Sequence, residues 1–249
     1  METNHSFSLS GKQLLVTGAS SGIGRAAAVM CSKFGASLVI TGRNKKRLDE
    51  TLYLLEGNSH KAMIADLMNE DDIVALVQSL PMLDGVVHCA GIGHRKPCKM
   101  LTASDINKVM GINFNSIVIL QSLLLSERKI NRSSSIVFIA SRAAYSPSIG
   151  NALYSASKGA LVSYAKCLAL ELASRMIRVN CICPAMVWTD LIYEGGLTKE
   201  YLEKEQLKYP LKRYGTPEDV ANLVIYLLSD ASSWMTGSSL DLTGGANNL

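Results

Sequence analysis

Long apolar runs, clustered charge and metal-binding patterns are all missing from this sequence of 249 residues. No uninterrupted apolar stretch of about 18 residues occurs, and the opening METNHSFSLSGK has neither the basic nor the apolar segment of a secretory signal. We therefore expect a cytoplasmic protein with no membrane partner. Charged residues make up 18% of the chain, the net charge is +4, and no run of five like charges occurs. Nucleic acid is therefore not an expected partner.

Cysteine is present, but not in a pattern that binds metal or forms a disulfide framework. The six cysteines lie mostly in apolar stretches and are Cys31, Cys89, Cys98, Cys167, Cys181 and Cys183. No CxxC pair or histidine cluster accompanies them. We expect no metal site, and we interpret the cysteines as buried free thiols of a protein in a reducing compartment.

Short β-branched runs alternate with longer helical patterns along almost the whole chain. The expected strands are 13–17, 36–41, 61–65, 85–90, 135–140, 177–183 and 238–243. The longest helical patterns between them cover about 102–127 and 152–173. Apolar strands separated by helices predict an α/β fold with a doubly wound parallel sheet covered on both faces. We expect one domain over 1–249, with one long irregular insert at about 188–214 that serves as a substrate loop.

The first expected strand leads directly into TGASSGIG, residues 17–24. Gly18, Gly22 and Gly24 permit a tight turn, a close approach of the backbone to an anion, and close packing of the next helix on the strand. That helix would direct its first N–H groups at a pyrophosphate. A glycine-rich turn can also be purely structural, but its place between a first strand and a first helix favours dinucleotide binding.

Two residues at the ends of the next strands bear on the choice of cofactor. Arg43 follows the second expected strand, where an acidic residue favours NAD and an arginine can pair with a 2′-phosphate. No acid is present there, so we expect NADP(H), with NAD(H) possible; the alternative is an ordinary exposed arginine. Asp66 follows the third expected strand and could accept a hydrogen bond from the adenine amino group, or cap the next turn.

Tyr154 and Lys158 lie four residues apart in YSASK, which places both on one face of a helix. A phenol with a pKa of about 10 exchanges protons poorly at neutral pH, and a nearby ammonium lowers that pKa. The spacing alone is common by chance. Ser141, at the end of the fifth expected strand, could hold a substrate oxygen near the phenol. Asn113 could complete a proton path through water to Lys158. Alternatively, Ser141 is a turn residue, Asn113 a polar group in a helix, and Tyr154 a surface aromatic.

Taken together, these motifs resemble the short-chain dehydrogenase/reductase superfamily from about Gly11 to the end of the chain. CPAMVWT at 183–189, RYGTPEDVA at 213–221 and the closing TGG at 243–245 add to the resemblance. It implies a seven-stranded Rossmann sheet ordered 3-2-1-4-5-6-7 and hydride transfer at the nicotinamide. It also implies that Tyr154 is the acid/base, that Lys158 lowers its pKa and holds the nicotinamide ribose, and that Thr189 bonds the carboxamide.

The resemblance and the motifs together give two sets of expected site residues. The expected catalytic residues are Asn113, Ser141, Tyr154 and Lys158. The expected cofactor-binding residues are Gly18, Ser20, Ser21, Gly22, Ile23, Gly24, Arg43, Asp66, Leu67, Ala90, Gly91, Tyr154, Lys158, Pro184, Val187 and Thr189.

The sequence departs from the family's usual pattern at three positions. Cys89 stands where the family has asparagine before Ala-Gly, and the lost amide predicts weaker local rigidity. Ala185 replaces the glycine of Pro-Gly, which is tolerable if the backbone angle φ there is negative. Ser21 stands where NADP-preferring members often carry a basic residue, so Arg43 would read the 2′-phosphate unaided.

For the substrate, the sequence most resembles the 3-oxoacyl-acyl-carrier-protein reductases of this superfamily. Arg132 and Arg175 are similar in placement to basic residues that meet the acidic carrier, although Arg175 could instead neutralise a helix end and Arg132 be ordinary surface charge. We expect reduction of a carrier-linked 3-oxoacyl group, with acyl carrier protein as partner. The alternatives are a sugar, a steroid or another small secondary alcohol, or a non-catalytic dinucleotide sensor. The resemblance also implies a homotetramer.

Overall fold

A seven-stranded parallel sheet, in the order β3-β2-β1-β4-β5-β6-β7, forms the centre of the computed structural model. The structure describes residues 5–193 and 196–246. The strands are Gln13–Thr17 (β1), Ser37–Gly42 (β2), Lys61–Ile64 (β3), Leu83–His88 (β4), Ile130–Ile139 (β5), Arg178–Pro184 (β6) and Ser239–Leu242 (β7). All neighbouring pairs are parallel. The predicted Rossmann sheet and its strand order are confirmed.

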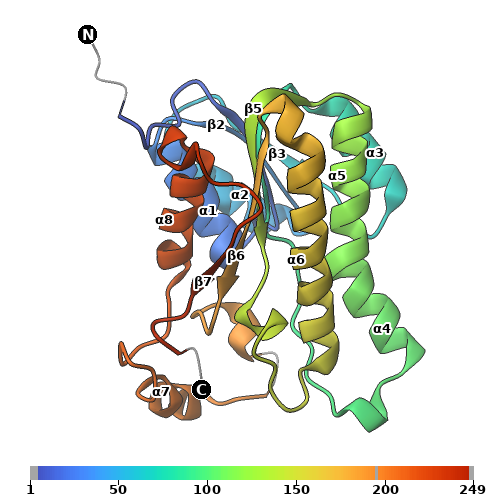
Figure 1. The fold of residues 1–249 in the computed structure, drawn as a ribbon, viewed down its shortest axis with the longest axis vertical. Helices are drawn as coiled ribbons and strands as arrows, with labels where there is room; N and C mark the ends of the chain where they lie inside the picture. Colours follow the sequence, from blue (N-terminus) through green and yellow to red (C-terminus); the bar gives the residue numbers. More distant parts are fainter. Residues whose placement is uncertain (1–4, 194–195, 247–249) are drawn as a thin grey trace.

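Helices cover both faces of this sheet (Figure 1). They are Gly22–Lys33 (α1), Lys45–Tyr53 (α2), Glu70–Ser79 (α3), Ala103–Met110 (α4), Ser116–Ser126 (α5), Ala152–Leu172 (α6), Lys199–Gln206 (α7) and Pro217–Leu228 (α8). Helices α1, α2 and α8 lie on one face, and α3, α5 and α6 lie on the other. The sheet is therefore the middle of three layers, with one apolar core on each side.

Alternation of side chains along the strands explains why two cores form. In β5, Ile136 and Phe138 enter the core under α5 and α6, whereas Val137 and Ile139 enter the core under α1 and α8. Successive residues of a strand point to opposite faces, so a strand covered on both faces is apolar at most of its positions. This is the physical basis of the continuous apolar runs in the sequence.

The long helix predicted over 102–127 is present, with a change of pitch in its middle. Helix α4 is followed by a π-helical turn, Gly111–Asn115, and then by α5. Thr102 and Asp105 form a capping box at its start. A π-helical turn inside an α-helix often marks a functional site, and this one contains Asn113.

Among the described residues, one helical stretch, Ala103–Ser126, is long and apolar enough to span a membrane by length and composition, with a mean hydropathy of 1.6. It is a core helix of this fold. Ile117, Leu120 and Leu124 are fully buried in the core on the sheet. Of the 18-residue apolar window within this stretch, 44% is buried inside the chain.

Three sequence expectations need correction. The insert at 188–214 is not irregular, because it contains α7 and a small core of Ile192, Leu202 and Tyr214. Strand β5 begins at Ile130, five residues before the predicted start. Its first part is polar, contains a residue with positive φ and shifts register against β4, so the sequence pattern does not reveal it as strand. Cys98 and Cys167 are exposed thiols, whereas the other free cysteines are buried or partly buried.

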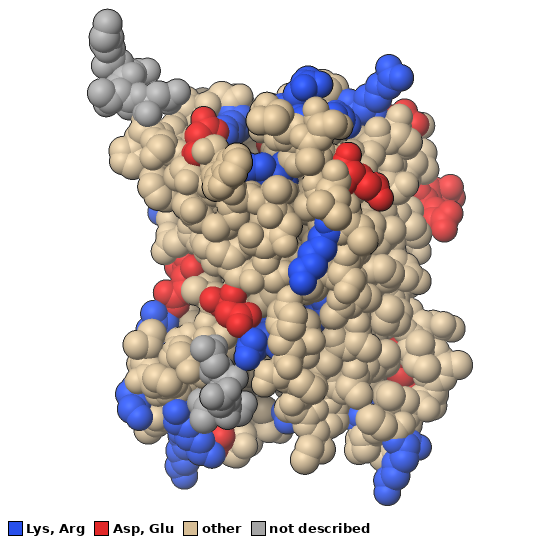
Figure 2. Space-filling model, in the orientation of Figure 1, with Lys and Arg blue, Asp and Glu red and all other residues tan. Residues whose placement is uncertain are grey.

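Charged side chains of both signs are scattered over the face seen in Figure 2, and the surface over α6 is largely uncharged. The described residues form no basic stripe across this face. The dispersed charge of the sequence is thus dispersed on this side of the fold as well.

Candidate active site

The glycine-rich turn after β1 packs tightly against the end of β4. Gly18 has a φ of +64°, and a Cβ there would lie 2.8 Å from the backbone nitrogen of Ala90. A Cβ on Gly24 would overlap the Gly18 carbonyl group. Larger residues would therefore push α1 away from the sheet. Both glycines serve the close approach that the sequence predicted.

The first turn of α1 is left open to an anion. Its N-cap residue, Ser21, makes no side-chain cap hydrogen bond, and no acidic residue lies in the first turn. The first N–H groups of a helix have no partner within the helix, and they carry partial positive charge. The residues present therefore fit a dinucleotide pyrophosphate, as predicted for this turn.

The predicted adenosine end lies beside the same turn. A Cβ on Gly42, the last residue of β2, would lie 3.4 Å from Ser20 Oγ, so the exposed Arg43 follows directly beside the turn. Asp66 Oδ1 accepts a hydrogen bond from the Met68 N–H at 3.0 Å. Asp66 therefore caps the next turn, and its contact with an adenine amino group stays a prediction. Leu67 is partly buried against the core.

Tyr154 and Lys158 lie on the first two turns of α6. The Lys158 ammonium nitrogen is 5.9 Å from the centroid of the Tyr154 ring. Lys158 is 4% exposed and donates a hydrogen bond of 2.9 Å to the carbonyl of Ile139, the last residue of β5. Burial lowers the pKa of Lys158 to about 8, so that it remains mainly an ammonium at neutral pH. The charge expected beside the phenol is therefore in place.

Ser141 follows β5 and stands at the start of a short helix, Arg142–Ala144. Its Oγ accepts a hydrogen bond of 3.1 Å from the Ala143 N–H, so the turn role considered for Ser141 is real. A hydroxyl that accepts one bond still has a proton to donate. Ser141, Tyr154 and Lys158 line one cavity of about 650 Å³.

Asn113 is fully buried behind this cavity. Its Oδ1 accepts from the Ile92 N–H at 2.8 Å, and its Nδ2 donates to the Ile92 carbonyl at 3.0 Å and to Ser157 Oγ at 3.1 Å. A Cβ on Gly91 would lie 3.3 Å from Asn113 Oδ1 and 3.4 Å from Lys158 Nζ. The amide thus holds Ile92, and Gly91 lies close to both the Asn113 side chain and the Lys158 ammonium.

The cavity joins the expected catalytic residues to part of the predicted cofactor site. Its lining includes these expected cofactor residues: Ile23, Gly91, Pro184, Val187 and Thr189. The insert contributes an apolar wall of Leu191, Ile192, Leu197 and Leu202, with the charged Glu205 and Lys208 beside it. Arg43, Asp66 and Leu67, which are expected at the adenosine end, are not part of this lining.

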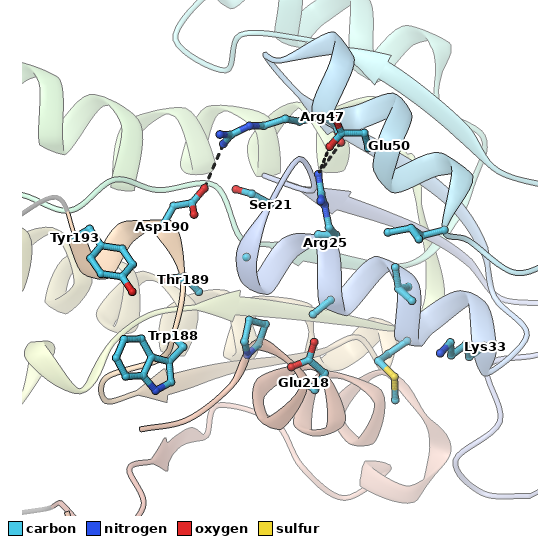
Figure 3. A pocket seen from close by; sticks show the side chains of 16 residues that line it. Ser21, Arg25, Lys33, Arg47, Glu50, Trp188, Thr189, Asp190, Tyr193 and Glu218 are labelled. Atoms are coloured by element: carbon cyan, nitrogen blue, oxygen red, sulfur yellow. Dashed lines mark hydrogen bonds and ion pairs between the residues drawn. The ribbon is translucent and has the colours of Figure 1, made fainter. Parts of the chain in front are cut away.

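A second cavity, of about 780 Å³, lies over the outer side of α1 (Figure 3) and shares Thr189 with the first. Arg25 donates to the Ser20 carbonyl at 2.7 Å and pairs with Glu50 at 3.2 Å. Figure 3 shows Arg47 and Asp190 pointing toward one another beside Ser21, at 3.3 Å. Sequence reasoning missed Arg25, although it is the first charged side chain after the glycine-rich turn.

Comparisons with known proteins agree with this geometry. A family model described as enoyl-(acyl carrier protein) reductase matches residues 18–247. A 3-oxoacyl-acyl-carrier-protein reductase, FabG, of Rickettsia felis is 35% identical over 237 residues, covering 95% of this chain and 97% of the relative. The chain belongs to the short-chain dehydrogenase/reductase family. It is an oxidoreductase that acts on CH–OH groups, and the family uses NAD(P).

Two solved structures of the short-chain dehydrogenase/reductase family show the same fold with different names and cofactors. A 3-ketoacyl-acyl-carrier-protein reductase of Brucella melitensis complexed with NADH has a TM-score of 0.85 and 30% identity, covering 96% of this chain and 100% of that one. A protein of Beutenbergia cavernae described as an NAD(P)-dependent gluconate 5-dehydrogenase, with bound NADP, has a TM-score of 0.86 and 31% identity, covering 96% and 98%.

The departures from the family pattern leave the backbone of the site intact. The N–H groups of Cys89 and Ala90 both donate to Thr17 Oγ1, at 3.1 and 3.3 Å. Thr17 therefore holds the backbone of this segment, and the effect of Cys89 on local rigidity stays a prediction. Ala185 is not among the residues with positive φ in the described part of the chain. The condition for tolerating alanine there is met.

No group of three or more His, Cys, Asp or Glu side chains placed to hold a metal ion occurs in residues 5–193 and 196–246. Cys89, Cys181 and Cys183 surround Lys158, but burial raises the pKa of Cys89 and Cys181 to about 12 and that of Cys183 to about 11. Metal ligation requires thiolates. These cysteines are protonated thiols at neutral pH.

Proposed function

We propose that the chain is an NADP(H)-dependent reductase that converts a ketone to a secondary alcohol, with a 3-oxoacyl thioester on acyl carrier protein as its substrate. The observation that carries the proposal is the single cavity that joins Ser141, Tyr154 and Lys158 to the expected nicotinamide-side residues under an apolar wall. A bound nicotinamide dinucleotide would supply the hydride. The chain supplies orientation and the proton.

Each polar group has a separate task in this reaction. The Ser141 hydroxyl donates a hydrogen bond to the substrate carbonyl oxygen and fixes its position. As negative charge develops on that oxygen, the Tyr154 hydroxyl gives it a proton. The buried ammonium of Lys158 stabilises the resulting phenolate. Asn113 holds Ile92 next to Gly91 and Lys158, and in this proposal Lys158 passes a proton back to Tyr154 from solvent.

The acyl substrate is supported by the identity to the Rickettsia reductase and by the apolar wall of the cavity. The Beutenbergia neighbour favours a second candidate, a sugar acid or its ketone. A non-catalytic dinucleotide sensor would have no need of a phenol, an ammonium and a serine around one cavity. We therefore do not favour it.

The positions of Arg132 and Arg175 bear on which subunit of an oligomer a bound acyl carrier protein would serve. Arg132 lies near the start of β5 and Arg175 just after the end of α6, whereas Ser141 and Tyr154 lie at the opposite ends of these elements. Helix α6 has 21 residues, a length of about 30 Å. A carrier that met these arginines would therefore serve the site of another subunit. Arg175 also donates to the Ile130 carbonyl, which ties down the end of α6.

We propose a homotetramer in which further copies cover the apolar helices. More than half of the apolar window in Ala103–Ser126 is only partly buried or exposed in the single chain. Leu170, on the outer side of α6, is 80% exposed. The free exposed thiols Cys98 and Cys167 suit a reducing, cytoplasmic compartment.

The reaction is tested by following NADPH oxidation with acetoacetyl thioester, ketoses and ketosteroids. We expect turnover with the thioester, and Tyr154→Phe should lower kcat at least about 100-fold because the proton donor is lost. NADPH fluorescence should still be quenched when it binds to this variant. If the thioester is not reduced but a ketose or a ketosteroid is, the proposed acyl substrate is wrong. Full activity of Tyr154→Phe would contradict the proposed role of Tyr154 as proton donor.

The preference for NADP(H) is tested at Arg43. This arginine is exposed and has no hydrogen-bond or ion-pair partner among the residues that the structure describes. Arg43→Asp should raise the KM for NADPH by about tenfold or more and shift preference toward NADH, because a charge-assisted bond to the 2′-phosphate becomes a repulsion. Lys46→Asp, the same charge change at an exposed neighbour, is the control. Equal effects of both variants would show that Arg43 does not bind the 2′-phosphate of NADPH.

A further inference from the structure

The catalytic cavity is lined by more cations than its chemistry uses. Besides Lys158, the cationic side chains along it are Arg95, Arg142 and Lys208. Arg142 pairs with Asp241 at 2.8 Å, and Lys208 pairs with Glu205 at 2.7 Å. His94 also lines the cavity and faces Asp105 at 3.5 Å. Arg95 is exposed and has no acidic or hydrogen-bonding partner among the described residues.

Both neighbours of Arg95 are held by one carboxylate. Asp105 accepts from Lys96 Nζ at 2.6 Å and faces His94 Nε2 at 3.5 Å. The hydrogen bonds from Lys96 and Thr102 hold the pKa of Asp105 well below its usual range, so it is ionised throughout the working range. The segment that carries Arg95 is therefore fixed to the start of α4, while Arg95 itself is left unneutralised.

The base of Arg95 lies close to the start of the catalytic helix. The Lys96 N–H donates to the Gly150 carbonyl at 2.7 Å, and a Cβ on Gly150 would lie 3.4 Å from Arg95 Cγ. Gly150 precedes Tyr154 by four residues. Helix α6 has no side-chain cap and no acid in its first turn, and its partial positive charge adds to that of Arg95 at this end of the cavity.

We propose that Arg95 is a specificity residue that binds an oxyanion, a carboxylate or a phosphate, on the carbonyl substrate. The inference rests on the proposed ketone reduction and narrows its substrate class to anionic ketones. Arginine binds both groups through paired N–H donors. The apolar side chains of the lining, Leu191, Ile192, Leu197 and Leu202, suit the uncharged body of such a substrate.

Binding is measured separately from turnover, by titration calorimetry on the NADPH-loaded Tyr154→Phe enzyme. Two matched pairs of ketones are used: acetoacetate with methyl acetoacetate, and acetoacetyl-pantetheine 4′-phosphate with acetoacetyl-pantetheine. We expect the anionic member of at least one pair to bind about tenfold more tightly than its neutral partner. The pair that shows the preference distinguishes a carboxylate on the substrate from a phosphate on its carrier arm.

Substitutions at Arg95 then test whether this side chain binds the anionic group of the ketone. Arg95→Gln should abolish the preference and leave the neutral ketones unchanged, and Arg95→Lys should retain most of it. Arg128→Gln, an exposed arginine outside both cavities, is the matched control. Equal binding within both pairs, or a preference that survives Arg95→Gln, overturns the proposal.

Steady-state kinetics of the wild-type background separate this inference from the proposed function. Arg95→Gln should raise KM for the anionic ketone by about tenfold with little change in kcat, because the contact is made before the chemical step as well as during it. Reduction of none of the four ketones, with the binding preference intact, would reject the proposed reaction and keep the anion site. Reduction without any charge preference would reject the anion site alone.

Discussion

At the scale of single residues, the site depends on a lysine that is buried against its ordinary preference. Lys158 is 4% exposed, with one hydrogen bond to the Ile139 carbonyl. Desolvation disfavours the ammonium, which is why its pKa falls to about 8. The residue therefore supplies charge to the phenol at a cost in stability.

This cost predicts a pH-dependent difference between Lys158→Met and the wild type. Between pH 8 and the unfolded pKa of about 10.4, the unfolded chain binds more protons than the folded chain, so the Lys158 contribution to stability rises with pH. We expect Lys158→Met to be the more stable chain at pH 7 and to lose about 2 kcal/mol of that advantage by pH 10.

The measurement is urea unfolding of the cofactor-free chains from pH 7 to 10. Only the difference between the two chains is used, because the raised pKa values of Cys89, Cys181 and Cys183 lower the stability of both as pH rises above about 9. A difference that stays constant over this range would contradict a depressed Lys158 pKa.

At the scale of elements, the junction of β1 and α1 is the most tightly constrained. Gly24 faces the Gly18 carbonyl with no room for a Cβ, and Gly18 in turn faces Ala90 at the end of β4. The junction must stay close because the N-terminus of α1 is the expected pyrophosphate site. Its packing and its binding function therefore depend on the same glycines.

Substitution of Gly24 by alanine should damage both stability and binding. The new methyl group meets backbone, which cannot move aside cheaply, so we expect a loss of about 1–3 kcal/mol in the free energy of unfolding. NADPH affinity, read from fluorescence quenching, should fall as well. Gly159→Ala in α6 is the control: its Cβ would meet nothing within 4 Å, and it should stabilise the chain by up to about 1 kcal/mol. Equal stability of the two variants would refute the packing role.

At the scale of the whole molecule, the single chain leaves one helical layer incompletely covered. The helix from Ala103 to Ser126 is apolar, but only 44% of its window is buried, and the neighbouring α6 exposes Leu170. On the opposite layer, Tyr53 of α2 is 90% exposed as a single aromatic. The proposed tetramer buries the first surface and leaves the second free.

Light scattering on the purified chain should therefore give the mass of four copies. Leu170→Glu should reduce that mass, because a carboxylate would be buried without a partner in the interface. Tyr53→Glu, a similar change on the opposite layer, should leave the mass unchanged. A monomeric wild type would reject the tetramer and, with it, delivery of a carrier from one subunit to another.

Much of this protein is readable from its sequence because the signals are local. The strands alternate with helices, the glycine-rich turn follows β1, and Tyr154 and Lys158 share the first turns of α6. Each of these features depends on a periodicity or spacing within about 20 residues. The order of the strands came from family resemblance, and the structure confirms it.

What only the tertiary structure decided are contacts between distant segments. Arg47 meets Asp190 across 143 residues, Thr17 holds the backbone of Cys89 and Ala90, and Arg95 is left without an acid beside the catalytic cavity. Helix α7 was missed because its eight residues form their stabilising core with Tyr214 and other residues outside the helix. A sequence fixes which face of an element is apolar, whereas charge pairing and cavity shape depend on how elements pack together.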